Sequence, residues 1–121
     1  MAIHREIFIL AGHDHPNLMR LFEVIDTKTH VNLLIELCSG LTLSNYIRSN
    51  GAANKTVIQT QGQRSNCFIS EAKSIFREIV TAVAYMHELG LIHKGLTTDN
   101  IMIDEKGTNI KIIDFSQAIS Y

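Results

Sequence analysis

Two stretches in the second half of the chain decide how it folds: LIHKGLTTDNIMI at residues 91–103 and IIDFS at residues 112–116. Each contains a short apolar run, and the turn at Asp104–Gly107 lies between the two runs, which predicts a hairpin of two short strands. Asn100 enters the first strand and Asp114 leaves the second, so we expect both side chains at the same end of the hairpin. Oxygen ligands of this kind suit Mg²⁺, which keeps several waters and binds one or two protein oxygens.

The same two stretches resemble the signature motifs of the protein kinases. In that family a catalytic loop H-R-D-L-x-x-x-N is followed by D-F-G. This chain has HKGLTTDN from His93 to Asn100, and then DFS from Asp114 to Ser116. The spacing from histidine to asparagine matches the family, and both metal-binding positions are filled. The resemblance implies that ATP and Mg²⁺ are the cofactors, with Asn100 and Asp114 as the metal ligands.

The positions that carry out phosphoryl transfer depart from the family pattern. Gly95 stands where the family has the aspartate that accepts the substrate proton. Thr97 stands where a serine/threonine kinase carries a lysine, and Ser116 replaces a glycine. The sequence has no Gly-rich loop and no strand-three lysine, so Glu6, at the helix-C glutamate position, lacks that partner. A positioned base contributes roughly 10²–10⁴ in rate. We therefore expect no intact catalytic residue, and the sequence leans against enzymatic activity.

The resemblance also assigns positions around the nucleotide. Ile35 falls on the gatekeeper, Glu36 and Cys38 fall on the hinge that meets adenine, and Met102 falls on the floor of the adenine pocket. The resemblance further implies an apolar column that links the two lobes, made of Leu10, Leu21, His93 and Phe115. Core packing alone also accounts for these four residues.

A structural interpretation remains open for each polar residue of the predicted site. Asn100 can hydrogen-bond its own loop, Asp114 can cap a turn, and His93 can be a buried histidine with its hydrogen bonds satisfied. Nearby histidines at positions 13 and 15 flank Asp14, but the further close ligands that structural zinc requires are missing. We therefore expect a solvated loop and no zinc site there.

The order of predicted elements gives an α+β fold class and one domain. The resemblance makes it a partial protein-kinase-like fold, from helix C to the DFG equivalent, with an incomplete small-lobe sheet and part of the helical lobe. Its expected parts are a small-lobe remnant at residues 1–36, a hinge-like connector at 37–41, and the start of the helical lobe at 42–121. The expected helices cover residues 3–11, 42–48 and 70–89, and the expected hairpin before the hinge pairs residues 18–25 with 31–36.

Residues 52–67 differ in character from their neighbours. Asn, Lys, Thr, Gln, Gly, Arg and Ser dominate this stretch, and no apolar period runs through it. We expect Asn50-Gly51 to end the preceding helix and Ser70 to cap the following one. The sequence therefore predicts a surface insertion, of a length uncommon for loops in compact domains.

The composition excludes several classes of function. The 121 residues are 45% apolar with a net charge of −1, which fits a globular protein and gives no electrostatic reason to expect nucleic acid or a membrane as partner. Cys38 and Cys67 lack CxxC spacing, so we expect two reduced thiols and a cytoplasmic protein, with one disulfide as the alternative. No apolar run reaches the length of a membrane span, and the amino terminus does not resemble a secretory signal.

The local sequences LFEVID at residues 21–26 and FREIVTAV at residues 76–83 are similar to the calcium/calmodulin-dependent group of kinases, and within it to the AMP-activated and microtubule-affinity-regulating branch. We expect a truncated, catalytically inactive serine/threonine kinase-like domain (a pseudokinase) that interacts with another protein, such as a kinase, a substrate or a chaperone. The alternatives are a fragment of a genuine ATP-dependent serine/threonine kinase in signalling, and a degenerate product without a selected function.

Overall fold

The computed structural model describes residues 2–57 and 64–121 of the chain, and the side chains of residues 4–50 and 70–121. The order of helices and strands is α1 Ala2–Ala11, β1 Leu21–Asp26, β2 Val31–Ile35, β3 Leu41–Thr42, α2 Leu43–Val57, α3 Arg64–Glu88, β4 Leu91–Ile92, the 3₁₀ turn η1 Thr98–Asn100, β5 Ile101–Ile103, β6 Ile110–Ile112 and β7 Ile119–Ser120. The α+β class expected from the sequence is confirmed.

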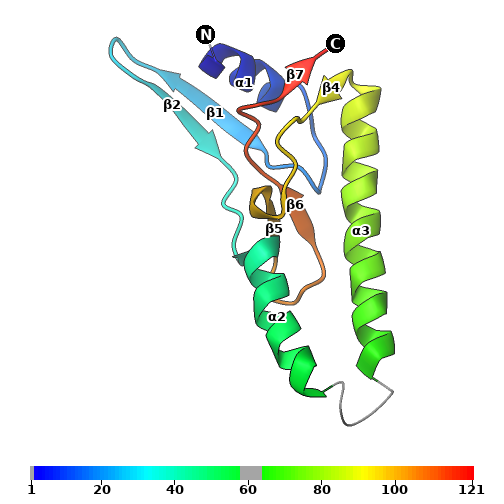
Figure 1. Cartoon of the computed structure of the whole chain (residues 1–121). Helices are drawn as coiled ribbons and strands as arrows, with labels where there is room; N and C mark the ends of the chain where they lie inside the picture. Colours follow the sequence, from blue (N-terminus) through cyan, green and yellow to red (C-terminus); the bar gives the residue numbers. More distant parts are fainter. Residues whose placement is uncertain (1, 58–63) are drawn as a thin grey trace.

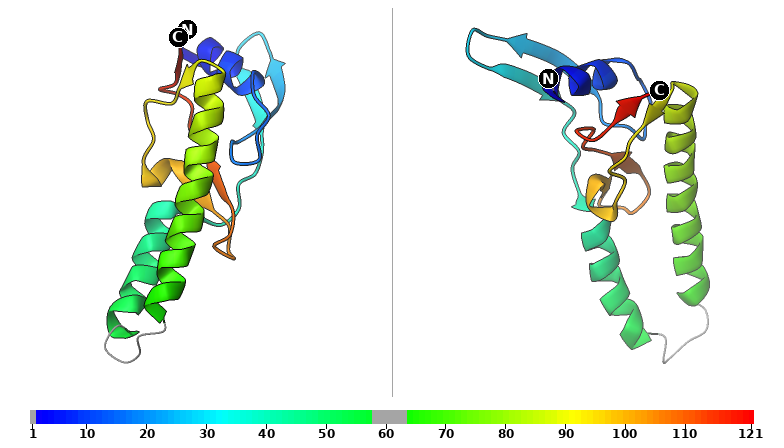
Figure 2. Two further views of the ribbon diagram at one scale, coloured as in Figure 1. Left: turned by 90° about the vertical axis from the view of Figure 1, so that its right-hand side faces the viewer. Right: turned by 45° about the horizontal axis from the view of Figure 1, so that its top comes forward.

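The strands form three small antiparallel sheets among the described residues, ordered β1-β2, β3-β5-β6 and β4-β7. The middle sheet lies at the centre, with α1 and the β1-β2 hairpin towards one end of the molecule, and α2 and α3 extending towards the other (Figure 1). Figure 2 shows the same arrangement from two further directions, with the β1-β2 hairpin projecting away from α3. A parallel bridge between Leu18 and Ile112 joins the segment before β1 to the middle sheet.

Helix α1 buries part of the face that the i, i+4, i+7 spacing of Ile3, Ile7 and Leu10 predicts, and Ile9 beside it. We expected Ile7 and Leu10 to share the buried face with Ile3, whose side chain lies outside the described residues. Leu10 and Ile9 are the buried pair, at 2% and 1% exposure, and Ile7 is only partly buried. The helix contacts both β1 and β7. These two neighbours bury the successive residues Ile9 and Leu10, whereas the sequence spacing predicted one row of apolar residues along the helix. It ends at Gly12 as predicted.

The predicted insertion at 52–67 is largely helical, and this is a correction. Helix α2 continues past Asn50-Gly51 to Val57, and α3 begins at Arg64, six residues before the expected cap at Ser70. Residues 58–63 lie outside the described part of the chain. Glycine inside a helix costs only about 1 kcal/mol relative to alanine, so Gly51 was a weak stop signal. Thr42 does cap α2, because its hydroxyl oxygen accepts a hydrogen bond from Asn45 N–H at 3.2 Å.

The turn between β5 and β6 forms where the sequence predicts it, because Asp104 organises it. Its carboxylate accepts hydrogen bonds from the backbone N–H and hydroxyl of Thr108, at 2.8 and 2.9 Å, and from Asn109. The backbone bond from Thr108, followed by these others, lowers the pKa of Asp104 to about 2. Gly107 has a φ of 69°, which glycine adopts without the strain that a Cβ would cause.

The long helix α3 is fastened to the middle sheet through the side chain of Glu78. One oxygen of this half-buried carboxylate accepts hydrogen bonds from the Ile110 backbone N–H at 2.8 Å and from Asn17 Nδ2 at 3.0 Å. Asn17 Nδ2 also donates to the Ile110 carbonyl at 2.9 Å. Three segments that are far apart in sequence therefore meet at a single carboxylate. None of the described helices is long and apolar enough to cross a membrane.

We predict that Glu78→Ala destabilises the chain by about 1–3 kcal/mol, because it leaves a part-buried backbone donor and an amide without their acceptor. Denaturant unfolding followed by circular dichroism measures this change. Glu88→Ala is the matched control on the same helix, since Glu88 is exposed, and it should shift the midpoint little. Equal midpoints for the two variants would show that Glu78 does not fasten the helix.

Candidate functional site

The loop between β4 and η1 is held by the imidazole of His93, which is 5% exposed. The Gly95 backbone N–H donates to His93 Nδ1 at 3.1 Å, and His93 Nε2 lies 3.1 Å from the Ile113 carbonyl oxygen. A backbone N–H can only donate and a carbonyl can only accept, so Nδ1 is the acceptor and Nε2 carries the hydrogen. This single neutral tautomer joins the loop at Gly95 to the strand that precedes Asp114.

Asn100 lies at the end of the loop, where η1 passes into β5. Its side-chain Nδ2 donates to the Gly95 carbonyl at 2.7 Å, and its backbone N–H donates to the Thr97 carbonyl at 3.0 Å. Its own carbonyl accepts the Ile113 backbone N–H at 2.9 Å. The structure therefore brings Asn100 beside the residue that precedes Asp114, as the hairpin predicted. The amide bond across the loop also agrees with the structural interpretation of Asn100.

Asp114 has a φ of 59°, in the left-handed region. Its Oδ1 accepts the Ser116 hydroxyl at 2.6 Å and the Ser116 backbone N–H at 3.2 Å. An aspartate that bonds the backbone two residues further on forms an Asx turn, and aspartate tolerates this backbone conformation better than most residues. The side-chain and backbone hydrogen bonds from Ser116, in that order, lower the pKa of the Asp114 carboxyl.

The oxygen atoms of Asn100 and Asp114 are of the type that binds a hard divalent cation, but one oxygen of Asp114 is already hydrogen-bonded. Asn100 supplies an amide oxygen and Asp114 a carboxylate, which are the oxygen ligands that Mg²⁺ prefers. Asn100 uses its amide nitrogen for the loop, so its Oδ1 keeps its lone pairs for a ligand. One oxygen of Asp114 is already engaged by Ser116, which leaves its second oxygen. No group of three or more acidic, histidine or cysteine ligands occurs in the described ranges 2–57 and 64–121.

At the two remaining loop positions, the structure shows no acid or base. Gly95 is held by its hydrogen bonds to His93 and Asn100, and an added Cβ would meet Gln117 Cγ at 3.4 Å and Asn100 Nδ2 at 3.7 Å. Thr97 is exposed, and its hydroxyl does not cap η1. Neither position carries a group that can take a proton from an alcohol near neutral pH.

Comparison with known proteins explains this arrangement. The model of the protein kinase domain family matches residues 1–121. The chain belongs to the protein kinase family. Among its curated relatives, sperm motility kinase 2B of Mus musculus is 36% identical over 110 residues, which cover 91% of this chain and 20% of that protein. CBL-interacting serine/threonine-protein kinase 1 of Arabidopsis thaliana is 33% identical over 115 residues, or 95% of this chain and 22% of that protein. The chain thus spans about a fifth of the length of these relatives.

The predicted hinge position Glu36 forms an ion pair that the sequence did not reveal. Lys111 Nζ lies 2.7 Å from one Glu36 carboxylate oxygen and 2.9 Å from the other, with both side chains about three-quarters buried. Lys111 is the register partner of Met102 across β5 and β6. The predicted adenine positions Glu36 and Met102 are therefore connected through Lys111. Cys38 packs against the core, and burial, with Glu36 as the second cause, raises the pKa of its thiol.

The four residues of the predicted apolar column all belong to the core or pack against it. Phe115 is fully buried, and its ring lies 5.2 Å from that of His93, edge to face. Leu10 is buried and Leu21 packs against the same cluster. Glu6 lies one helical turn before the buried Ile9 and Leu10. It is only partly buried and forms no ion pair among the side chains that the structure describes.

His13 joins this cluster without having been predicted there. Its ring lies 5.3 Å from that of Phe115, and it is 9% exposed. Neither ring nitrogen has a hydrogen-bond partner, and His13 is the only buried side chain of which this is true among those that the structure describes. Burial lowers the pKa of His13, Asp14 opposes the shift, and His15 adds to it. The loop around His13 that we expected to be solvated is therefore partly buried; no zinc ligand group forms there.

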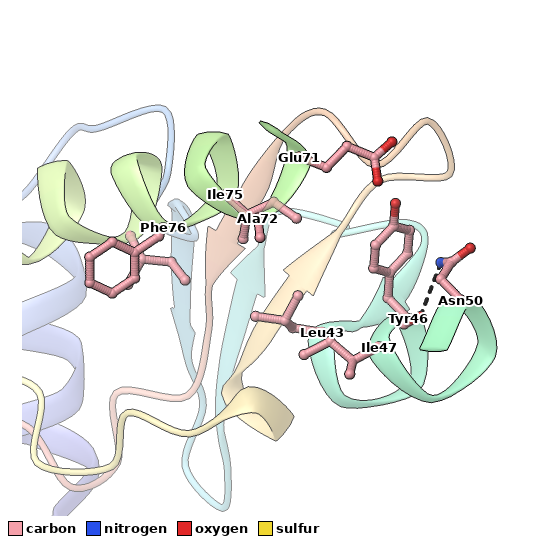
Figure 3. A pocket seen from close by; sticks show the side chains of 9 residues that line it. Leu43, Tyr46, Ile47, Asn50, Glu71, Ala72, Ile75 and Phe76 are labelled. Atoms are coloured by element: carbon pink, nitrogen blue, oxygen red, sulfur yellow. Dashed lines mark hydrogen bonds between the residues drawn. The ribbon is translucent and has the colours of Figure 1, made fainter. Parts of the chain in front are cut away.

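A separate apolar groove of about 260 Å³ lies between α2 and α3 (Figure 3). Figure 3 shows side chains from both helices around it, with Glu71 and Asn50 at one end. Burial, followed by the carboxylates of Glu71 and Asp104, raises the pKa of Tyr46 at that end. The residues that line the groove are Leu43, Tyr46, Ile47, Asn50, Glu71, Ala72, Ile75, Phe76 and Ile79.

Sequence reasoning missed two features of the site and left a third open. The Lys111–Glu36 pair has no short-range signal, because 75 residues separate its members. The burial of His13 depends on packing against Phe115 and could not be recognised from a polar stretch. The Ser116 bond to Asp114 agrees with the structural interpretation that Asp114 caps a turn. Its signal was a hydroxyl two residues after an aspartate, a common turn pattern.

We predict that the chain loses stability as the pH falls below 6.5, the ordinary pKa of histidine, and that His13 accounts for part of the loss. Its folded-state pKa is lowered, so the unfolded chain binds the proton more readily between that lowered value and 6.5. His13→Leu should therefore raise stability by about 1–3 kcal/mol at pH 7, by removing two unsatisfied nitrogens, and should flatten the dependence below pH 6.5.

Denaturant unfolding at a series of pH values from 7.5 to 5 measures both effects. His4→Ala is the matched control, since His4 is exposed on α1, and it should leave the slope unchanged. If His13→Leu keeps the slope of the unsubstituted chain, the buried histidine is not the titrating group.

Proposed function

We propose that this chain is an inactive protein-kinase-like domain, a pseudokinase that acts in the cytoplasm by binding another protein. The observation that carries the proposal is Gly95 at the position of the proton-accepting aspartate, in a loop that His93 and Asn100 hold in one arrangement. His93 and Asn100 hold the Gly95 backbone at both its N–H and its carbonyl. The loop is formed, and the acid–base group is missing from it.

Packing does not require glycine at position 95. Gly95 lacks the positive φ of Gly40, Gly90 and Gly107, and the nearest atoms to an added Cβ, from Gln117, lie at ordinary contact distance. A side chain could therefore stand here without forcing the loop to move. The glycine therefore removes the acid–base group from the loop, and the folding of the loop does not depend on it.

We predict that the chain transfers no phosphate to peptides. Incubation with Mg²⁺, radiolabelled ATP and generic basic peptide substrates should give no more incorporation than a heat-killed sample, because general-base help worth roughly 10²–10⁴ in rate is absent. Gly95→Asp should fold with near-unchanged stability and serves as the test of whether the base alone limits transfer. Robust transfer by the unsubstituted chain that disappears on Asp114→Ala would refute the proposal.

Nucleotide binding is expected to be weak or absent, and the same samples report on it. A ligand present at about 100 times its Kd stabilises the folded state by roughly 2.7 kcal/mol. Millimolar ATP with Mg²⁺ should therefore change the melting temperature of the chain little. A clear, metal-dependent rise would indicate a working nucleotide site around Glu36, Met102 and Asp114.

A segment of a genuine serine/threonine kinase is the second candidate. It is favoured by the retention of Asn100 and Asp114, with Asn100 hydrogen-bonded to Ile113, the residue before Asp114. Relatives whose names describe them as kinases favour it too. Under this alternative, ATP and Mg²⁺ bind when the chain is part of its longer protein. Gly95 counts against it, since the base position carries no carboxylate. The one acidic residue of the loop, Asp99, is exposed and lies in η1, four positions later.

The interaction role draws support from the β1-β2 hairpin. Apolar side chains with substantial exposure lie on both strands, Phe22 at 60% and Ile25 at 47% on β1, and Leu34 at 52% on β2. Patches of exposed apolar side chains mark interaction surfaces in many soluble proteins. We infer that this hairpin is the surface that a partner protein covers.

We predict that Phe22→Asp with Leu34→Asp abolishes partner binding while the chain stays folded, because both side chains are more than half exposed. Proximity labelling in cells should recover a set of neighbours that this double variant loses. The matched control is Leu89→Asp, which changes a leucine of 45% exposure at the end of α3 and should keep those neighbours. Identical neighbour sets for all three proteins would contradict the assigned surface.

A further inference from the structure

We propose that the hydroxyl of Ser116 is a built-in competitor for the divalent cation at Asp114. The inference concerns cation binding alone, so it holds or fails independently of whether the chain transfers phosphate. It rests on where the hydrogen bonds of one carboxylate go.

Both bonds from Ser116 end on the same oxygen. The hydroxyl donates to Asp114 Oδ1 at 2.6 Å, and the backbone N–H donates to that oxygen at 3.2 Å. A hydroxyl–carboxylate distance of 2.5–2.7 Å is typical of a charge-assisted hydrogen bond, which is roughly twice as strong as a neutral one. A cation that approaches Oδ1 must displace this hydroxyl, or else bind through the second oxygen only.

The hydroxyl is the part of this arrangement that depends on the residue type. Any residue other than proline at position 116 could donate its backbone N–H to Asp114 in the same turn. Only a hydroxyl or similar donor adds the shorter bond. The glycine that kinases carry at this position has no such group, so in this chain the serine adds a donor where the family has none.

At Asn100, the other predicted ligand, no hydrogen bond from a described residue competes with the cation for the side-chain oxygen. Asn100 donates from its Nδ2 to the Gly95 carbonyl, and this bond leaves the amide oxygen as its second polar group. The competition is therefore local to Asp114 and Ser116. Both residues are exposed, so removal of the hydroxyl should not disturb the core.

The test measures Mn²⁺ binding to the purified chain. Mn²⁺ is paramagnetic and broadens nearby amide signals in ¹H–¹⁵N spectra, and the signals to follow are those of Asn100 and Ile113. We expect Ser116→Ala to reach half-maximal broadening at a Mn²⁺ concentration about three- to tenfold lower than the unsubstituted chain, a change of up to about 1.4 kcal/mol. Ser116→Gly should show a gain in the same direction.

Two controls make the outcome specific. Ser120→Ala removes an exposed hydroxyl four residues away and should leave the Mn²⁺ dependence unchanged. Asp114→Asn placed on Ser116→Ala should cancel the gain, because the competing hydroxyl matters only through that carboxylate. Equal Mn²⁺ dependence of Ser116→Ala and the unsubstituted chain overturns the inference. The absence of broadening in both proteins overturns it as well, since the hydroxyl would then not be what limits binding.

Discussion

The arrangement of the site depends on one imidazole that bridges two loops. His93 accepts a hydrogen bond from Gly95 and donates one to Ile113, which fixes the loop after β4 against the end of β6. Asn100 adds a second connection, from its amide to Gly95 and from its carbonyl to Ile113. Phe115 then packs against the imidazole. Buried polar groups with all partners satisfied make a site rigid and specify one arrangement, and here this rigidity needs no catalytic side chain.

This separation of scaffold from chemistry explains how a kinase-family loop persists with Gly95 in it. The bonds that shape the loop run through backbone groups of residue 95, which glycine supplies as well as aspartate does. At Asp114, by contrast, the side chain itself is drawn into the structure, because Ser116 uses its carboxylate to close a turn. The same residue types can therefore maintain a fold while cation and proton chemistry weaken, and function must be argued from the side chains of the site rather than from the fold.

Much of the fold could be predicted because its signals are local. The β5-β6 hairpin, the Thr42 cap and the end of α3 near Gly90, whose φ is 73°, follow from apolar spacing and from turn and cap chemistry. The predictions failed where tertiary contacts, rather than local sequence, determine the structure. A polar composition hid the helical parts of residues 52–67, and the neighbours of α1, rather than its period, selected its buried residues. The Lys111–Glu36 pair and the His13–Phe115 contact join distant segments, so no local pattern reveals them.

We infer that His93, in one neutral tautomer, holds the loop and the segment that leads into Asp114 together in solution. Long-range ¹H–¹⁵N correlation spectra of the histidine rings at pH 7.5 test this most directly, because they distinguish Nδ1 from Nε2 by chemical shift. We predict a pattern for His93 with hydrogen on Nε2 and an Nδ1 that carries no hydrogen and accepts a hydrogen bond from Gly95. Asn100→Ala should lose this pattern only if the loop detaches. Averaged shifts that indicate a mixture of tautomers in the unsubstituted chain would contradict the account.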